Sequence, residues 1–188
     1  MSTYPAPDTQ RLLDFSIDVL TQALALVASH EHPGAPDYAA PAGAHLRHVI
    51  EHYEALLFPA EAGSVDYDRR PRDRELERVP AVARARLEAL QARLRPWAET
   101  PLDAPLQVRG LGGLAGDFEF AAASSAGREL VFVASHAIHH FALLRAHCVQ
   151  HGISINAQFG RAPATVAHDG AALLTPPTTS LKETLCNT

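Results

Sequence analysis

The sequence has few cysteines, no long apolar run and no excess of basic residues, and each shortage excludes a class of protein. Two cysteines, Cys148 and Cys186, are too few for a disulfide-stapled scaffold. The most apolar stretch, residues 20–28, is far shorter than the roughly 20 residues that span a bilayer. The first residues lack the basic segment and apolar run of a secretory signal. We therefore expect a cytoplasmic protein that does not cross a membrane.

The charge balance argues against a nucleic-acid partner. The chain has 16 basic and 21 acidic residues, and its arginine-rich stretch, residues 69–95, is interleaved with acidic residues. Such a mixture is typical of a solvated helix face, whereas nucleic-acid binding requires a basic patch. With 188 residues, 47% of them hydrophobic, the chain is long enough for one core and short for two domains. We expect one domain over residues 1–169 and a disordered tail over residues 170–188.

Apolar residues at helical spacing predict four main helices. Their expected ranges are residues 9–29, 41–58, 80–95, and Ser124 or Ser125 to His151. Between the third and fourth helices, residues 106–109 and 117–120 look extended and flank a glycine-rich run, so they predict a small β-hairpin. The predicted fold class is therefore all-α: an antiparallel four-helix bundle with a small β-hairpin between helices 3 and 4. Such bundles build metal sites between facing helices.

Histidine is unusually frequent in this sequence. There are 11 histidines, and three pairs are spaced four apart: His48/His52, His136/His140 and His147/His151. Residues four apart lie on one face of a helix, and all three pairs fall on predicted helices. One such pair is weak evidence, but inward-facing pairs on two different helices are hard to explain by chance.

Two explanations of these histidines remain open. Buried imidazoles without partners cost a few kcal/mol each, and coordination of a metal removes that cost by using the ring nitrogens. Alternatively, the histidines are hydrogen-bonded core residues of a bundle that binds no metal. The first explanation is favoured by the clustering.

Two segments resemble a known family. Residues 43–57 (GAHLRHVIEHYEALL) and 135–143 (SHAIHHFAL) resemble the histidine motifs of the DinB/YfiT-like superfamily, and residues 159–166 are similar to the segment that closes many of its members. The likeness covers residues 9–168. It implies a four-helix bundle in which His48, His136 and His140 bind one divalent transition metal, with water or substrate in the remaining positions.

The other histidines and one carboxylate are not predicted to bind the metal directly. His45, His52 and Glu129 are candidates to orient a ligand or to act as the general base. His139 is expected to point elsewhere, and His147 lies too far along its helix to share the ion. We interpret four histidines as surface residues: His30, His32, His151 and His168. No nucleophile is identified, and Cys148 is interpreted as a packed apolar residue.

The resemblance implies a metal-dependent transferase or hydrolase, with thiol transfer slightly preferred because some family members transfer low-molecular-weight thiols. Three histidines leave an open metal position, as in catalytic sites. The ion would be zinc, nickel or iron, all of which suit imidazole. The expected partner is a small-molecule substrate such as a low-molecular-weight thiol. The alternative is a non-catalytic metal- or ligand-binding bundle, and a homodimer is an option that no seam in the sequence specifies.

Overall fold

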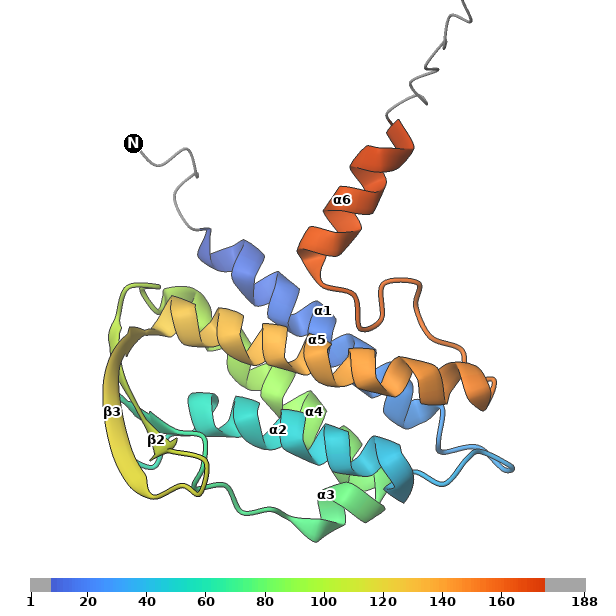
Figure 1. Cartoon of the computed structure of the whole chain (residues 1–188), viewed down its shortest axis with the longest axis horizontal. Coiled ribbons are helices and arrows are strands. Elements are labelled where there is room, and N and C mark those ends of the chain that lie inside the picture. The colour runs from blue at the N-terminus through green and yellow to red at the C-terminus, as the bar shows by residue number, and fades with distance from the viewer. Residues whose placement is uncertain (1–7, 175–188) are drawn as a thin grey trace, which may run out of the picture.

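Four long helices form the helical body of the protein. The computed structural model describes residues 8–174. The long helices are α1 (Thr9–Ala28), α2 (Ala44–Leu57), α4 (Pro80–Leu94) and α5 (Ala126–Gln150). Both α1 and α2 pack against α4 and α5, so the core lies between these four elements (Figure 1). All four predicted helices are present, although α2 begins at Ala44 instead of Pro41.

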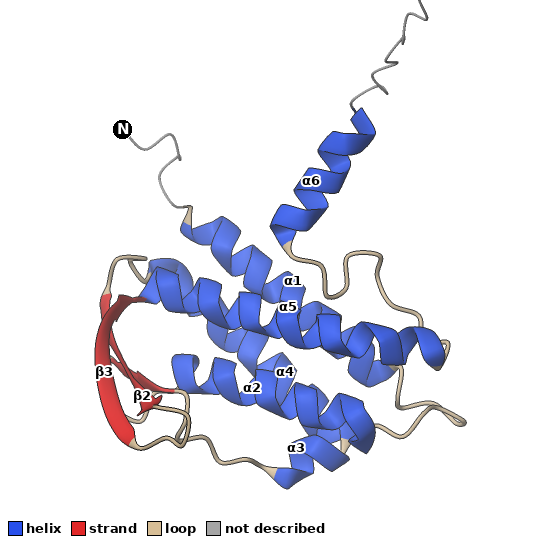
Figure 2. Cartoon of the chain, viewed as in Figure 1, coloured by secondary structure: helices blue, strands red, loops and turns tan. Residues whose placement is uncertain are grey.

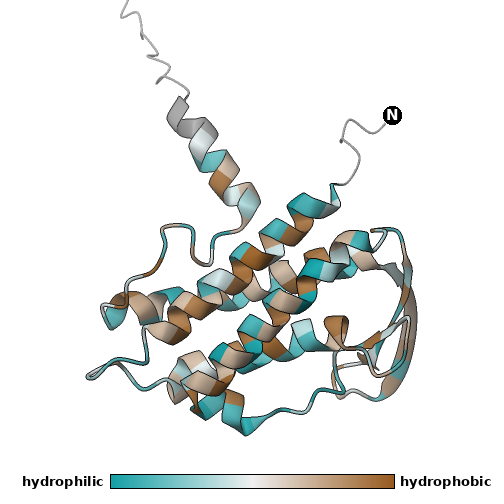
Figure 3. Ribbon diagram, turned by 180° about the vertical axis from the view of Figure 1, so that it is seen from behind, coloured by the Kyte–Doolittle hydropathy of each residue, from teal (hydrophilic) through white to brown (hydrophobic). Residues whose placement is uncertain are grey.

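Capping side chains and apolar stripes explain where these helices form. Asp8 accepts a hydrogen bond from the Arg11 backbone N–H at 3.2 Å and caps α1, and Ser125 does the same for Arg128 at 3.3 Å at the start of α5. Pro80 occupies the first position of α4, where its missing N–H costs nothing. The apolar residues of each helix form bands that alternate with polar ones (Figure 3), as expected of helices buried on one side.

Shorter helices connect or extend these four. A π-helical turn, Ala39–Gly43, leads into α2, and α3 (Arg74–Arg78) precedes α4. A 3-10 turn, Arg95–Glu99, follows α4. The last described helix, α6 (Pro163–Leu174), leads away from the other helices (Figure 1). The four helices predicted from the sequence do not include α6.

A sheet lies beside the helices (Figure 2), and it has three strands. Its strands are β1 (Ser64–Asp66), β2 (Pro105–Gly112) and β3 (Phe118–Ser125), in the order β1-β2-β3. β2 and β3 pair antiparallel from Pro105↔Ser125 to Gly112↔Phe118, at the place where the sequence predicts a hairpin. β1 pairs parallel to β2, with Val65 opposite Val108. The sheet is therefore mixed.

The prediction of an all-α antiparallel four-helix bundle is wrong. Residues 8–174 contain six α-helices and a mixed three-stranded sheet, so helix and sheet share the fold. Sequence analysis missed β1 because it is three residues long, too short to show the two-residue period of a strand. Only Val65 of β1 is buried, and its polar neighbours read as a connection.

The start of α2 is held by a close backbone contact with α3. A Cβ atom on Gly43 would lie 2.0 Å from the Glu77 carbonyl oxygen, so only glycine fits there. Beside this contact, the Tyr38 hydroxyl donates a hydrogen bond to the Leu76 carbonyl at 3.0 Å. Together the two contacts fix where α2 begins relative to α3.

The predicted tail is only partly described. Residues 170–174 belong to α6, and residues 175–188 lie outside the described residues. Within residues 8–174, we find no helix whose length and apolar character would allow it to cross a membrane.

Candidate metal centre

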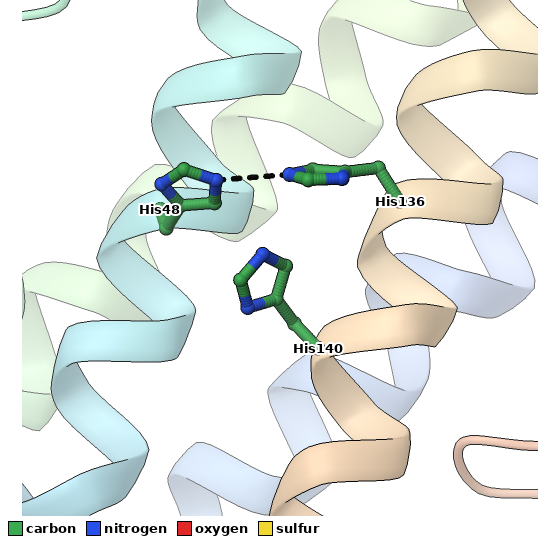
Figure 4. Close-up of side chains that lie close together, drawn as sticks. All are labelled: His48, His136 and His140. Carbon is green, nitrogen blue, oxygen red and sulfur yellow. Dashed lines mark hydrogen bonds between the residues drawn. The ribbon is translucent and has the colours of Figure 1, made fainter. Parts of the chain in front are cut away.

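Three histidine side chains converge between α2 and α5. One nitrogen from each of His48, His136 and His140 lies within 4.8 Å of the other two. His48 Nε2 and His136 Nε2 are 2.9 Å apart, and the His140 ring points toward the same space (Figure 4). His136 and His140 share a face of α5 because they are four residues apart. The structure thus brings together the three predicted ligands in an arrangement that could hold a metal ion.

Burial keeps these three rings neutral. Desolvation, followed by repulsion from neighbouring charges such as His52, lowers the pKa of His48 to about 3. Desolvation and the neighbouring His136 lower the pKa of His140 to about 3 as well, and the pKa of His136 is lowered mainly by desolvation. Metal ligation requires a neutral imidazole, so at neutral pH no proton has to leave an imidazolium before an ion binds. The donor set, three neutral nitrogens, fits a divalent transition metal.

His45 orients one of the three rings. Its Nδ1 lies 2.8 Å from Nδ1 of His140, so one of the two nitrogens donates a hydrogen bond to the other. This contact leaves His140 Nε2 available toward the shared space. Histidines that bind metals commonly use their second nitrogen in this way. The prediction that His45 flanks the site fits this placement.

His52 flanks the site on the other side. Its Nδ1 donates a hydrogen bond to the His48 carbonyl oxygen at 2.7 Å, and its ring stacks on Tyr67 at 5.4 Å between ring centroids. The His52 side chain is buried, and desolvation lowers its pKa to about 4. Its ring centroid is 4.5 Å from that of His136, but His52 does not belong to the group of three converging nitrogens.

Glu129 contacts the hydroxyl of Tyr67 and accepts hydrogen bonds from three side chains. Its buried carboxylate accepts hydrogen bonds from the Tyr67 hydroxyl at 2.8 Å, from Arg128 Nη1 at 2.6 Å and from the Ser124 hydroxyl. Tyr67 in turn stacks on His52, so Glu129 reaches the histidines through an intervening ring. This placement suits a residue that orients Tyr67 better than one that accepts a proton from substrate.

Sequence analysis missed two residues next to His48. Arg70 Nη1 lies 3.0 Å from His48 Nδ1 and 3.4 Å from the carboxylate of Glu51. Glu51 is buried and also accepts the Asp73 backbone N–H at 2.7 Å. Glu51 was detectable in principle, as a carboxylate three residues after His48 and therefore on the same side of the helix. Arg70 carried no local signal because it sits in a connection among many arginines.

The other histidines lie apart from this centre. His139 is exposed, in keeping with the expectation that it points elsewhere, and its ring is 6.5 Å from that of His136. The prediction that His30 is a surface residue is wrong, because only 7% of it is exposed. His30 packs against His147, whose ring is 6.4 Å away, and His151 follows at 4.4 Å from His147. Cys148 is buried, as its interpretation as a packed residue requires.

A cavity of about 1020 Å³ lies between α2, α4 and the sheet. Its wall includes Arg70, which contacts His48, and Glu51, which contacts Arg70. A smaller cavity of about 630 Å³ is lined by Phe132, whose ring stacks on His136 at 5.6 Å. Each cavity is therefore separated from the three histidines by an intervening side chain, Arg70 in the larger and Phe132 in the smaller.

Comparisons with known proteins assign no family. No family model matches the chain, and no solved structure matches it. A stretch of 104 residues, 55% of this chain, is 33% identical to a protein of Rhizopus delemar named FK506-binding protein 5. The matched region spans only 27% of that protein, so its name describes a much longer chain.

Proposed function

We propose that the protein binds one divalent transition metal through His48, His136 and His140, and that it belongs to the DinB/YfiT-like superfamily. The observation that carries the proposal is the convergence of three imidazole nitrogens, from two helices, within 4.8 Å of one another. Their lowered pKa values support it, because the neutral rings are ready to bind a cation. Zinc, nickel and iron all suit such ligands.

The proposed activity is a metal-dependent transferase or hydrolase reaction on a small molecule, with transfer of a low-molecular-weight thiol preferred. A divalent ion with three protein ligands and an open position lowers the pKa of a bound water or thiol. Among the protein's own groups, His52 is the best placed to accept a proton. Its Nδ1 is held by the His48 carbonyl, which leaves Nε2 free of a proton in the neutral ring.

A non-catalytic metal- or ligand-binding role is the alternative. The observation that favours it is the proximity of His52, whose ring centroid lies 4.1 Å from that of His48. If His52 became a fourth ligand, the coordination would be closed, as in structural sites. The two proposals therefore differ in whether a position on the ion stays open.

Metal binding is tested by equilibrating the stripped protein with zinc, nickel or ferrous iron and measuring the bound metal. We expect about one equivalent of at least one metal. The variant His48→Ala/His136→Ala/His140→Ala should bind none while staying folded. His139→Ala, which removes an exposed neighbouring histidine, is the matched control and should bind as the unaltered protein does. Absence of binding for all three metals would refute the proposal.

Turnover is tested separately with the loaded protein. We would incubate it with a low-molecular-weight thiol and a small electrophile, and with ester substrates, beside the stripped protein. Product formed only by the loaded protein supports the enzyme. Bound metal with no turnover in either assay, together with loss of a ligand in His52→Ala by X-ray absorption, would favour the closed, non-catalytic site.

A further inference from the structure

The hydrogen bond between Arg70 and His48 fixes where the proton of His48 lies. A guanidinium has donors and no acceptor, so Arg70 Nη1 donates to His48 Nδ1 at 3.0 Å. A neutral imidazole has one N–H, and His48 must therefore have its hydrogen on Nε2. That hydrogen is donated to His136 Nε2, 2.9 Å away.

This arrangement excludes metal ligation by the same ring. An imidazole that binds a metal through Nε2 has its hydrogen on Nδ1. The Nδ1–H of His48 would then face an N–H of Arg70, two donors without an acceptor. At His140 no such conflict arises, because its Nδ1 faces His45 Nδ1, which can accept. Metal binding at His48 and the hydrogen bond from Arg70 are therefore mutually exclusive.

Once released from His48, the guanidinium would remain in the wall of the large cavity. Arg70 also contacts Glu51 and donates its Nε–H to the Tyr67 carbonyl, and both contacts hold the side chain in place. It lines the cavity between α2, α4 and the sheet. Each of the cavity's four arginines pairs with a carboxylate there: Arg69 with Asp66, Arg70 with Glu51, Arg86 with Glu54, and Arg109 with Glu61. Nη1 carries two hydrogens, so release from His48 would free one of them for another acceptor while the other stays with Glu51 at 3.4 Å.

We propose that Arg70 couples metal binding at His48 to the binding of a small oxyanion, such as a carboxylate or phosphate group of a ligand, in this cavity. The proposal rests on the proposed metal site. An anion that pairs with Arg70 removes it from His48 and so favours the metal, and by thermodynamic reciprocity the metal favours the anion. The cavity wall has six carboxylates and four guanidiniums, so an anion has no general attraction to it. The effect therefore depends on Arg70 itself.

The first test measures zinc affinity by competition with a chromophoric chelator. Arg70→Met keeps the length of the side chain and removes the donors, and it should bind zinc about tenfold more tightly. The control is Arg47→Met. It removes the charge of the residue next to His48, whose guanidinium pairs with Glu77 at 2.7 Å and does not contact His48. An equal gain in both variants would show a simple charge effect, and weaker binding by Arg70→Met would show a structural role; either result overturns the proposal.

The second test adds sulfate, which binds guanidinium groups, against chloride at equal ionic strength. Sulfate should tighten zinc binding severalfold in the unaltered protein and leave Arg70→Met unchanged. A third measurement needs no variant: ¹⁵N NMR should find the His48 hydrogen on Nε2 without metal and on Nδ1 with zinc. Nδ1–H in the metal-free protein, or no effect of sulfate, would contradict the coupling.

The outcomes separate this inference from the proposed function. If the unaltered protein binds no zinc, nickel or iron, the metal site fails and the coupling fails with it. If it binds zinc but Arg70→Met and Arg47→Met behave alike, the metal site stands and only the coupling is wrong.

Discussion

Two groups of histidines each combine α5 with a second part of the chain, and among the described residues only one of the two groups brings three ring nitrogens together. The central histidines, His48, His136 and His140, direct nitrogens at a common point between α2 and α5. The end histidines, His30, His147 and His151, lie where α1 and α5 finish. His30 and His147 have parallel rings, with only 4° between their planes. Nε2 of each is buried without a hydrogen-bond partner among the described residues.

The difference shows that spacing along one helix does not by itself create a metal site. His136/His140 and His147/His151 have the same four-residue spacing, the first pair within α5 and the second at its C-terminal end, where His151 is the C-cap. In the first pair, His136 meets His48 of α2 nitrogen to nitrogen, whereas in the second pair His147 meets His30 face to face. Parallel stacked rings hold their lone pairs in separate planes, so they do not converge on one ion. The orientation of the facing ring, His48 or His30, therefore decides which of the two pairs has a third nitrogen directed at it.

The largest expected effect is loss of metal on substituting a central histidine. His136→Ala should weaken zinc binding by about 100-fold or more, or about 2.7 kcal/mol, because it removes a ligand. His147→Ala, the same change eleven residues later on α5, should leave the affinity within about twofold. Competition with a chelator measures both. Equal losses of zinc affinity in the two variants would contradict the expectation that only the central histidines bind the metal.

A smaller loss is expected when the orienting residue is removed. His45→Ala deletes the partner of His140 Nδ1, and loss of such partners typically costs 10- to 100-fold in metal affinity. We expect about tenfold for this half-buried residue, against no change for His151→Ala. An unchanged affinity in His45→Ala would mean that His140 is oriented by packing alone.

Acid should destabilise the metal-free protein through the central region. Burial lowers the pKa of His48, His52 and His140 in the folded state to between about 3 and 4, below the ordinary 6.5. Below pH 6.5 the unfolded chain therefore binds more protons, and the free energy of unfolding falls as the pH drops toward 4. After allowing for solvent screening of half-exposed rings, we expect a loss on the order of 1 kcal/mol per pH unit. Urea unfolding with a chelator present measures it, and a flat profile from pH 6.5 to 4.5 would contradict it.

The smallest effect is expected at the end histidines. His147→Leu replaces a ring whose buried Nε2 lacks a partner, so the apolar side chain should change the free energy of unfolding by less than about 1 kcal/mol. Urea unfolding at neutral pH is the measurement. A loss of several kcal/mol would indicate that a bound water or ion satisfies the end histidines.

The long helices and the three converging histidines could be predicted from sequence because both depend on local periodicity. The expected range 80–95 and the observed α4, Pro80–Leu94, nearly coincide, since proline at one end and an apolar stripe define it. Four-residue spacing placed His136 and His140 on one face. These signals lie within a single helix and need no knowledge of its neighbours.

The remaining features depend on contacts between distant segments. Strand β1 exists only because β2, some forty residues later, offers it a partner. Arg70 is set against His48 by a connection that has no periodic pattern. The burial of His30 follows from the packing of α1 against the end of α5, which its position at the end of a predicted helix did not reveal.

The close approach at Gly43 sets the axial position of α2, and with it the height of His48 opposite His136. The turn that carries Gly43 precedes His48 by five residues, little more than one helical turn, and its backbone rests on the Glu77 carbonyl. A methyl group there would clash with that carbonyl and displace the start of α2 from α3 by more than the 0.2 Å tolerance of a metal–nitrogen bond. The contact at Gly43 thus fixes the position of the helix that carries His48, although Gly43 lies outside the histidine cluster and has no side chain that could bind an ion.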